Sequence, residues 1–218
     1  TQPESSAASD VYKRQGCYGI FFNSQSLFND GQVIGVIGAI SLAFLMGLAD
    51  DAYNTKPRLK FLVQVFCGII LIISSKYTNQ NESLVIQLFQ SNYLNYGITI
   101  FWVVAMMNSI NMLDNMDGIT AQTSFFIITT AIIFLSFNSG FEKYDYMICL
   151  GAIGSLIGFL FYNFHPSRMF MGDSGSQFLG LLVAIIGIKY FWNIEDFKTG
   201  TTIPVSYTHL RAHETETN

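Results

Sequence analysis

Six apolar runs, separated by short polar segments, dominate the sequence between residues 32 and 192. They are Gln32–Ala49, Leu59–Ser75, Tyr96–Met107, Ile119–Phe137, Tyr146–Tyr162 and Gln177–Trp192. A helix that crosses a bilayer needs about 17–25 mostly apolar residues, and most of these runs come close to or reach that length. Charged residues make up 12% of the chain, against about 25% in soluble domains. The sequence therefore predicts an all-α polytopic membrane protein with about six transmembrane helices.

The two ends of the chain differ in character from the middle. Residues 1–15 and 206–218 are polar and lack any hydrophobic period, and they resemble the read-through of sequencing adapters. We expect both segments to be non-native, and residues 16–205 to be a partial membrane domain from a larger bundle. Ordinary disordered termini are the alternative. The net charge of −4 is too small to indicate a partner, and no nucleic acid is expected.

Polar side chains gather in three clusters between the apolar runs. The clusters are Ala49–Lys60 (ADDAYNTKPRLK), Asn108–Thr120 (NSINMLDNMDGIT) and His165–Ser176 (HPSRMFMGDSGS). Two runs separate the first cluster from the second, and two more separate the second from the third. Because an even number of crossings returns a chain to the same face, all three clusters are expected on one side of the membrane. Basic residues are balanced between the two faces, so the positive-inside rule gives no orientation.

The clusters bring five aspartates to one face: Asp50, Asp51, Asp114, Asp117 and Asp173. Neighbouring carboxylates repel one another unless a cation or a proton neutralises them. Carboxylate and amide oxygens suit Mg²⁺, which takes one or two protein carboxylates and leaves positions for phosphate. Lys60 adds a cation that could hold a phosphate. The residue types point to a metal–diphosphate site at the membrane face, although helix capping is the alternative for any single aspartate.

The spacing of the middle cluster predicts a polar stripe. Asn108 and Asn111 lie about one helical turn apart, and Asp114 continues the spacing by three residues. Polar side chains at the edge of a membrane span normally face a cavity or a partner. We therefore expect these three side chains to share one helix face, with Asp117 in a turn closed by Gly118.

Taken together, the clusters resemble those of the polyprenyl-phosphate N-acetylhexosamine-1-phosphate transferases, of the glycosyltransferase 4 type. The motifs that carry the resemblance are GLADDAYNTKPRLKFLVQ, NSINMLDNMDGIT and FNFHPSRMFMGDSGSQFLG, within about residues 31–204. The resemblance implies transfer of a sugar 1-phosphate from a UDP-sugar to a polyprenyl phosphate, with release of UMP. It further implies a bacterial inner membrane location with the motif loops in the cytoplasm, and a homodimer as one assembly to test.

The resemblance also implies roles for particular residues. Asp173 and Asn111 are the implied Mg²⁺ ligands, with Mn²⁺ as an alternative metal. Asp50 and Asp51 are placed beside the polyprenyl phosphate, where one of them is a candidate base, and Lys60 is expected to steady phosphate. Asp50, Asp51, Lys60 and Asp173 thus form the predicted catalytic set. The predicted substrate-binding set is Asn108, Asp114, Asp117 and Phe170, of which Asp114 and Asp117 line the nucleotide pocket and Phe170 stacks on uracil.

The match departs from the family pattern at one position inside the middle motif. Where the family usually has DGxDG, this chain has DNMDG, so Asn115 stands in place of a glycine and is predicted to occupy a strained turn. GlcNAc 1-phosphate is the favoured transferred group, and a phospho-MurNAc-pentapeptide transferase is the alternative within the family. From other classes, an ion-coupled transporter would place its acids near the bilayer midplane, and a membrane scaffold would need no metal.

Overall fold

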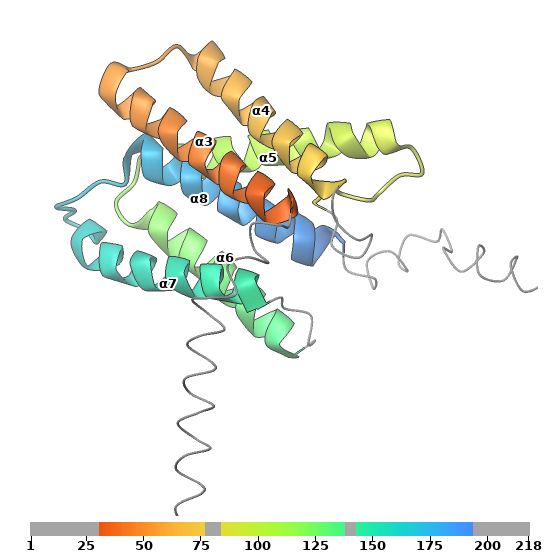
Figure 1. Cartoon of the computed structure of the whole chain (residues 1–218). Helices are drawn as coiled ribbons and strands as arrows, with labels where there is room; N and C mark the ends of the chain where they lie inside the picture. The colour runs from red at the N-terminus through yellow and green to blue at the C-terminus, as the bar shows by residue number, and fades with distance from the viewer. Residues whose placement is uncertain (1–30, 77–83, 138–142, 194–218) are drawn as a thin grey trace, which may run out of the picture.

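The computed structural model describes residues 31–76, 84–137 and 143–193 (Figure 1). The segments predicted to be non-native, 1–15 and 206–218, lie outside these ranges. The described residues form helices and connecting loops without strands. The elements are α3 (Gly31–Tyr53), α4 (Pro57–Ser75), α5 (Asn92–Leu113), α6 (Ile119–Phe137), α7 (Lys143–Asn163), α8 (Gly172–Gly187) and η2 (Ile188–Trp192), a π-helical turn that continues α8.

The all-α polytopic architecture predicted from the apolar runs is confirmed. Each of the six runs lies within one helix or, at the end of the chain, within α8 and η2. Five helices in the described ranges are long and apolar enough to cross a membrane, and the apolar stretch Ile119–Ile133 of α6 is shorter. The expectation of about six spans is therefore met by five full-length candidates and one shorter helix.

The helices extend beyond the apolar runs at the ends that carry the polar clusters. The run predicted to stop at Ala49 continues as helix to Tyr53, so Asp50 and Asp51 lie in its last turn. Helix α3 ends where Asn54 adopts a left-handed φ of 49°, and the Asn54 N–H bonds the Asp50 carbonyl at 2.8 Å. Hydropathy falls at the first polar residue, whereas backbone hydrogen bonding continues, and this difference explains the shift.

Helix α8 is the centre of the bundle. In Figure 1 it lies between the pair α3–α4 and the pair α6–α7, and its main neighbours are α3 and α5. In the most apolar 18-residue stretch of Gly172–Trp192, 72% of the residues are buried, against 22–33% in the other four spans. The central position of α8 brings its N-terminus, with Asp173 in the first turn, against the ends of the surrounding helices.

Glycines allow the backbones of these helices to approach closely. A Cβ added at Gly47 of α3 would lie 2.3 Å from the Asp173 carbonyl oxygen, and one added at Gly180 of α8 would lie 2.7 Å from Met107 Cα. Small residues at helix crossings are typical of membrane bundles, where close van der Waals packing drives association. The Gly47 contact fixes α3 against α8 one turn before Asp50.

The opposite end of the bundle is closed by residues 84–90. Leu84 and Ile86 are fully buried in the core formed with α3, α4, α5 and α8. The Ile86 N–H donates to the Thr99 hydroxyl at 3.0 Å, and Asn95 bonds both the N–H and the carbonyl of Phe89 at 2.8 Å. These side chains satisfy a loop backbone that has no ladder or helix of its own.

Candidate active site

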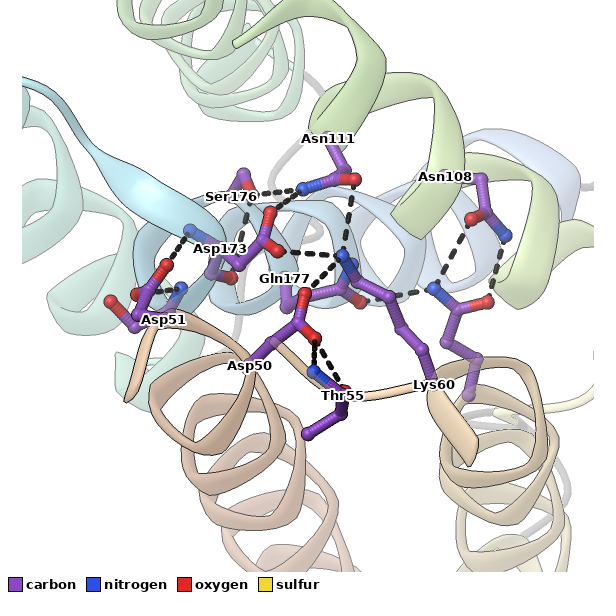
Figure 2. A network of polar contacts seen from close by, with 11 residues as sticks. Asp50, Asp51, Thr55, Lys60, Asn108, Asn111, Asp173, Ser176 and Gln177 are labelled. Carbon is purple, nitrogen blue, oxygen red and sulfur yellow. Dashed lines mark hydrogen bonds and ion pairs between the residues drawn. The ribbon is translucent and has the colours of Figure 1, made fainter. Parts of the chain in front are cut away.

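The three polar clusters meet at one end of the bundle, as the count of crossings predicted. The C-terminal turns of α3 and α5 and the N-terminal turns of α4 and α8 converge there (Figure 2). Direct contacts between their side chains join Lys60 of the first cluster, Asn111 of the second and Asp173 of the third. Side chains from all three clusters, which are far apart in the sequence, therefore form one polar network.

Lys60 is the hub of this network. Its Nζ lies 2.9 Å from Asp50 Oδ2 and 2.8 Å from Asp173 Oδ2, and 3.5 Å from Asn111 Oδ1. Asp50 is held from its other side by Thr55, whose backbone N–H donates to Asp50 Oδ1 at 2.8 Å and whose hydroxyl contacts the same oxygen. The ammonium offsets the repulsion between two partly buried carboxylates and holds both within reach of one ligand.

Asn111 completes the network on the side of α5. Its Nδ2 contacts Asp173 Oδ1 and donates to Ser176 Oγ at 2.8 Å, while its Oδ1 faces Lys60. Within the described ranges no group of three or more His, Cys, Asp or Glu side chains is arranged around one point. Asp173 Oδ2 and Asn111 Oδ1 both face Lys60 Nζ, and these carboxylate and amide oxygens are of the type that suits Mg²⁺, which takes few protein ligands when substrate phosphates complete its shell.

Asp51 faces a different partner from its neighbour Asp50. Its two carboxylate oxygens accept from the backbone N–H groups of Asp173 at 2.8 Å and Ser174 at 3.0 Å. Asp51 thus caps the N-terminus of α8 from another helix, where a negative charge is favourable. Gly172 has a φ of 70°, and a Cβ there would lie 3.0 Å from Asp51 Oδ2. The glycine is needed for both its conformation and the space.

Asp114 lies at the C-terminal end of α5, next to the network. Its backbone N–H bonds the Asn111 carbonyl at 3.3 Å. Burial raises the pKa of Asp114 to about 6, and the neighbouring carboxylates of Asp173 and Asp51 act in the same direction, while the Gly172 backbone opposes the shift. The Asp114 carboxyl group therefore binds its proton more tightly than an ordinary aspartate does.

Asp117 organises the loop at the start of α6. It accepts from Ser167 Oγ at 2.9 Å and lies 3.0 Å from His165 Nδ1; the hydrogen bond from Ser167 and the pairing with His165 lower the pKa of its carboxyl group. Phe170, the predicted stacking residue, is 72% exposed at the same end of the bundle.

The turn around Asn115 differs from its prediction. Asn115 has no positive φ, and Asn54 is the one non-glycine residue in the described ranges that does. Instead, Gly118 adopts a φ of 73°, and its N–H donates to Asn163 Oδ1 at 2.9 Å. The prediction of a strained Asn115 is therefore wrong: the second glycine of the motif provides the left-handed residue, and Asn115 Nδ2 bonds the Met112 carbonyl.

Asn108 lies deeper in the bundle than the rest of the predicted site. Its Nδ2 donates to Gln64 Oε1 at 2.7 Å, and Gln64 Nε2 donates to Gln177 Oε1 at 3.1 Å. The sequence analysis missed Gln64 and Gln177, and it also missed Asn163, whose side chain joins Gly118 to the Met169 carbonyl. The available signal was spacing, since Gln64 follows Lys60, and Gln177 follows Asp173, by four residues.

Comparison with known proteins identifies the family. Residues 33–191 match the family model described as glycosyl transferase family 4. The chain belongs to this family. All of the network residues, from Asp50 to Gln177, lie inside the matched range.

The most similar relatives of this glycosyl transferase family 4 chain include two kinds of enzyme. A probable undecaprenyl-phosphate N-acetylglucosaminyl 1-phosphate transferase of Bacillus subtilis is 29% identical over 195 residues, which cover 86% of this chain and 54% of the relative. A phospho-N-acetylmuramoyl-pentapeptide-transferase of Campylobacter jejuni is 29% identical over 189 residues, which cover 74% of this chain and 54% of the relative. An enzyme of the same name from Streptococcus suis is 30% identical over 169 residues, which cover 72% of this chain and 50% of the relative. The chain spans about half the length of the curated relatives it matches.

Proposed function

We propose that the protein transfers N-acetylhexosamine 1-phosphate, with GlcNAc 1-phosphate as the first candidate, from a UDP-sugar to undecaprenyl phosphate in a Mg²⁺-dependent reaction. One phosphate oxygen of the lipid attacks the phosphorus next to the sugar, a new P–O–P linkage forms, and the bridging oxygen leaves with UMP. The product would initiate cell-wall or surface-polysaccharide synthesis at the bacterial inner membrane, with the motif end of the bundle facing the cytoplasm.

The observation that carries this proposal is the bridge formed by Lys60. One ammonium joins Asp50 of α3 to Asp173 of α8 at 2.9 and 2.8 Å, at the ends of helices long enough to cross a membrane. A lipid phosphate that stays in the membrane and a soluble nucleotide sugar can meet at such a site. The family membership and the names of the relatives support the same chemistry.

In this reaction each side chain of the network has a separate role. Lys60 is placed to hold a phosphate oxygen of the substrates, with Asp50 beside it at the lipid phosphate. Direct attack needs little help from a base, because a phosphate oxygen is already ionised at neutral pH. Asp173 and Asn111 would hold the metal ion, which neutralises charge that develops on the leaving UMP. Asp114, Asp117 and Phe170 are assigned to the nucleotide.

The ion-coupled transporter, raised from the sequence alone, fits these positions less well. Its coupling acids would lie near the middle of the membrane, in interrupted helices. Asp50 and Asp173 instead occupy a last and a first helical turn at one end of the bundle. Chemistry at the membrane face accounts for this placement.

The test uses the full-length protein in membranes, supplied with radiolabelled UDP-GlcNAc, undecaprenyl phosphate and Mg²⁺. Label is expected in the lipid phase, and Asp173→Asn or EDTA is expected to reduce its rate of entry by about 10²-fold or more, as is typical when an electrostatic stabiliser is removed. Equal entry with EDTA or with the variant contradicts the metal assignment. No entry with the unaltered protein contradicts the GlcNAc donor.

The same membrane assay tests the second candidate within the family, a phospho-MurNAc-pentapeptide transferase. The relatives from Campylobacter jejuni and Streptococcus suis are named for phospho-N-acetylmuramoyl-pentapeptide transfer, so the muramoyl-pentapeptide UDP-sugar is offered in parallel. Preference for that donor would keep the reaction class and replace the transferred group.

A further inference from the structure

A second polar layer lies one helical turn beneath the charged network. It consists of Gln64, Asn108 and Gln177, and we call it the amide layer. Gln64 stands four residues after Lys60 on α4, Gln177 four residues after Asp173 on α8, and Asn108 three residues before Asn111 on α5. The same three helices therefore contribute one residue to each layer.

The amide layer repeats the connectivity of the charged network. Lys60 contacts both Asp173 and Asn111, and Gln64 below it contacts both Gln177, at 3.1 Å, and Asn108, at 2.7 Å. Gln64 is thus the hub of its layer, as Lys60 is of the layer above. Figure 2 shows Asn108 on the same helix as Asn111, and Gln177 close to Lys60 and Asp173.

The cost of burying these amides indicates a role beyond stability. Gln64 and Gln177 are each 1% exposed, and an apolar side chain in the same place would need no hydrogen-bond partner. Gln177 Nε2 is buried without a hydrogen-bond partner among the described residues. A layer selected only for stability would satisfy this donor or replace it, because unpaired buried donors are costly.

Directional hydrogen bonds between helices fix geometry that apolar contacts leave free. A single buried asparagine sets helix register in coiled coils at the expense of stability. Lys60 has a long, flexible side chain, so the position of its Nζ depends on how α4 is rotated and shifted against α5 and α8. The amide layer ties these three helices together one turn below the ammonium.

We infer that Gln64, with Asn108 and Gln177, is a positioning residue for the phosphosugar transfer. By setting the register of α4, α5 and α8, the amide layer holds Lys60 against Asp173 and turns Asp173 and Asn111 toward a shared metal ion, without touching substrate. This inference rests on the proposed function. A displacement of about 1 Å in such a site can lower the rate by about 10²-fold.

The test compares Gln64→Leu with a matched control, Asn95→Leu, in the full-length protein. Asn95 is also a buried amide, 5% exposed, and it also makes several hydrogen bonds, but at the opposite end of the bundle. Gln64→Leu is expected to lower kcat per folded molecule about tenfold or more and to change the KM for the UDP-sugar less than about twofold. Asn95→Leu is expected to lower the amount of folded protein with kcat per folded molecule unchanged.

A swapped pair tests the hydrogen bonds themselves. Gln64→Asn combined with Asn108→Gln keeps one long and one short amide facing each other, and it is expected to recover most of the kcat lost in Gln64→Asn alone. Failure of the swap to recover any activity would overturn the inference. So would Gln64→Leu behaving like Asn95→Leu, with kcat per folded molecule unchanged, because the layer would then serve stability alone.

Direct binding of Mn²⁺, followed by electron paramagnetic resonance on the same purified variants, separates this inference from the proposed function. Gln64→Leu is expected to weaken Mn²⁺ binding about tenfold, whereas Asn95→Leu leaves it unchanged. If the unaltered protein transfers no phosphosugar, the proposed function fails and Mn²⁺ affinity alone judges the amide layer. Equal affinity in both variants then overturns it.

Discussion

Asp50 and Asp51 show at the scale of single residues how two identical neighbours acquire different tasks. Asp50 pairs with Lys60 at 2.9 Å, within the charged network. Asp51, displaced by about 100° around the helix, bonds the backbone N–H groups at the start of α8. One carboxylate therefore belongs to the charged network, and the other holds the first turn of α8, which carries Asp173.

Replacing each carboxylate with an amide separates these tasks. Asp50→Asn is expected to lower kcat by about 10²-fold or more, because Lys60 loses a charged partner inside the site. Asp51→Asn keeps one acceptor oxygen and is expected to cost about 1 kcal/mol of stability, the usual range for a helix cap, with a smaller loss of kcat. Activity and thermal unfolding of both variants check the assignment, and equal losses of activity contradict it.

The raised pKa of Asp114 predicts that the stability of the protein depends on pH. Burial raises its pKa in the folded protein to about 6, from an ordinary value of 3.8. The folded state therefore holds the proton more tightly, and the associated stability is fully present below pH 4 and is lost as the pH rises through about 6. In EDTA, unfolding temperatures of the unaltered protein and of Asp114→Asn measured from pH 5 to pH 7 should diverge with this sign. Parallel curves would contradict the shift.

At the scale of elements, the contact between α3 and α8 places the site. Gly47 lets the α3 backbone lie against the first turn of α8, and Asp50 and Asp51 follow within the next turn. The tertiary cap from Asp51 then fixes the direction in which α8 begins. Close packing and the cap act on the same helix end, so each depends on the other.

Gly47→Ala tests this contact. The new methyl group would lie 2.3 Å from the Asp173 carbonyl oxygen, so we expect a loss of about 1–3 kcal/mol of stability from overpacking together with a loss of activity. Gly38→Ala, on the same helix with nothing within 4 Å of its Cβ, is the control and should keep stability or raise it by about 0.5–1 kcal/mol, because alanine is the better helix former. Similar behaviour of the two variants would show that α3 and α8 have room to separate.

At the scale of the whole molecule, the even number of crossings between clusters determines the topology. Cysteines introduced at Asn54, Met116 and Arg168 are expected to react with a membrane-impermeant reagent from one side, and a cysteine at Tyr93 from the other. Tyr93 is 86% exposed near the start of α5. The native Cys67 and Cys149 are buried, and Cys17 would be replaced by serine. A reaction of any one of the three motif cysteines from the same side as the cysteine at Tyr93 would contradict the predicted topology.

The positions of the helices, and the end of the bundle at which the polar clusters meet, follow from the amino-acid sequence alone. The length and apolar character of a run are local properties, and the count of runs between clusters needs no tertiary information. The spacing of Asn108, Asn111 and Asp114 likewise predicted a shared face. The helix boundaries shifted, because helical hydrogen bonding continues past the last apolar residue and carries Asp50 and Asp51 into α3.

The contacts between individual side chains depend on how the helices pack in three dimensions. Asp50 and Asp51 are equivalent in sequence, and their separate partners depend on how α3 is rotated against α8. Gln64 and Gln177 are buried against each other, and this contact depends on how α4 and α8 cross. Hydropathy indicates whether a segment enters the membrane. Hydrogen-bond partners depend instead on the rotation and register of one helix against another. Close contacts such as that at Gly47 fix the rotation and register only when the chain is folded.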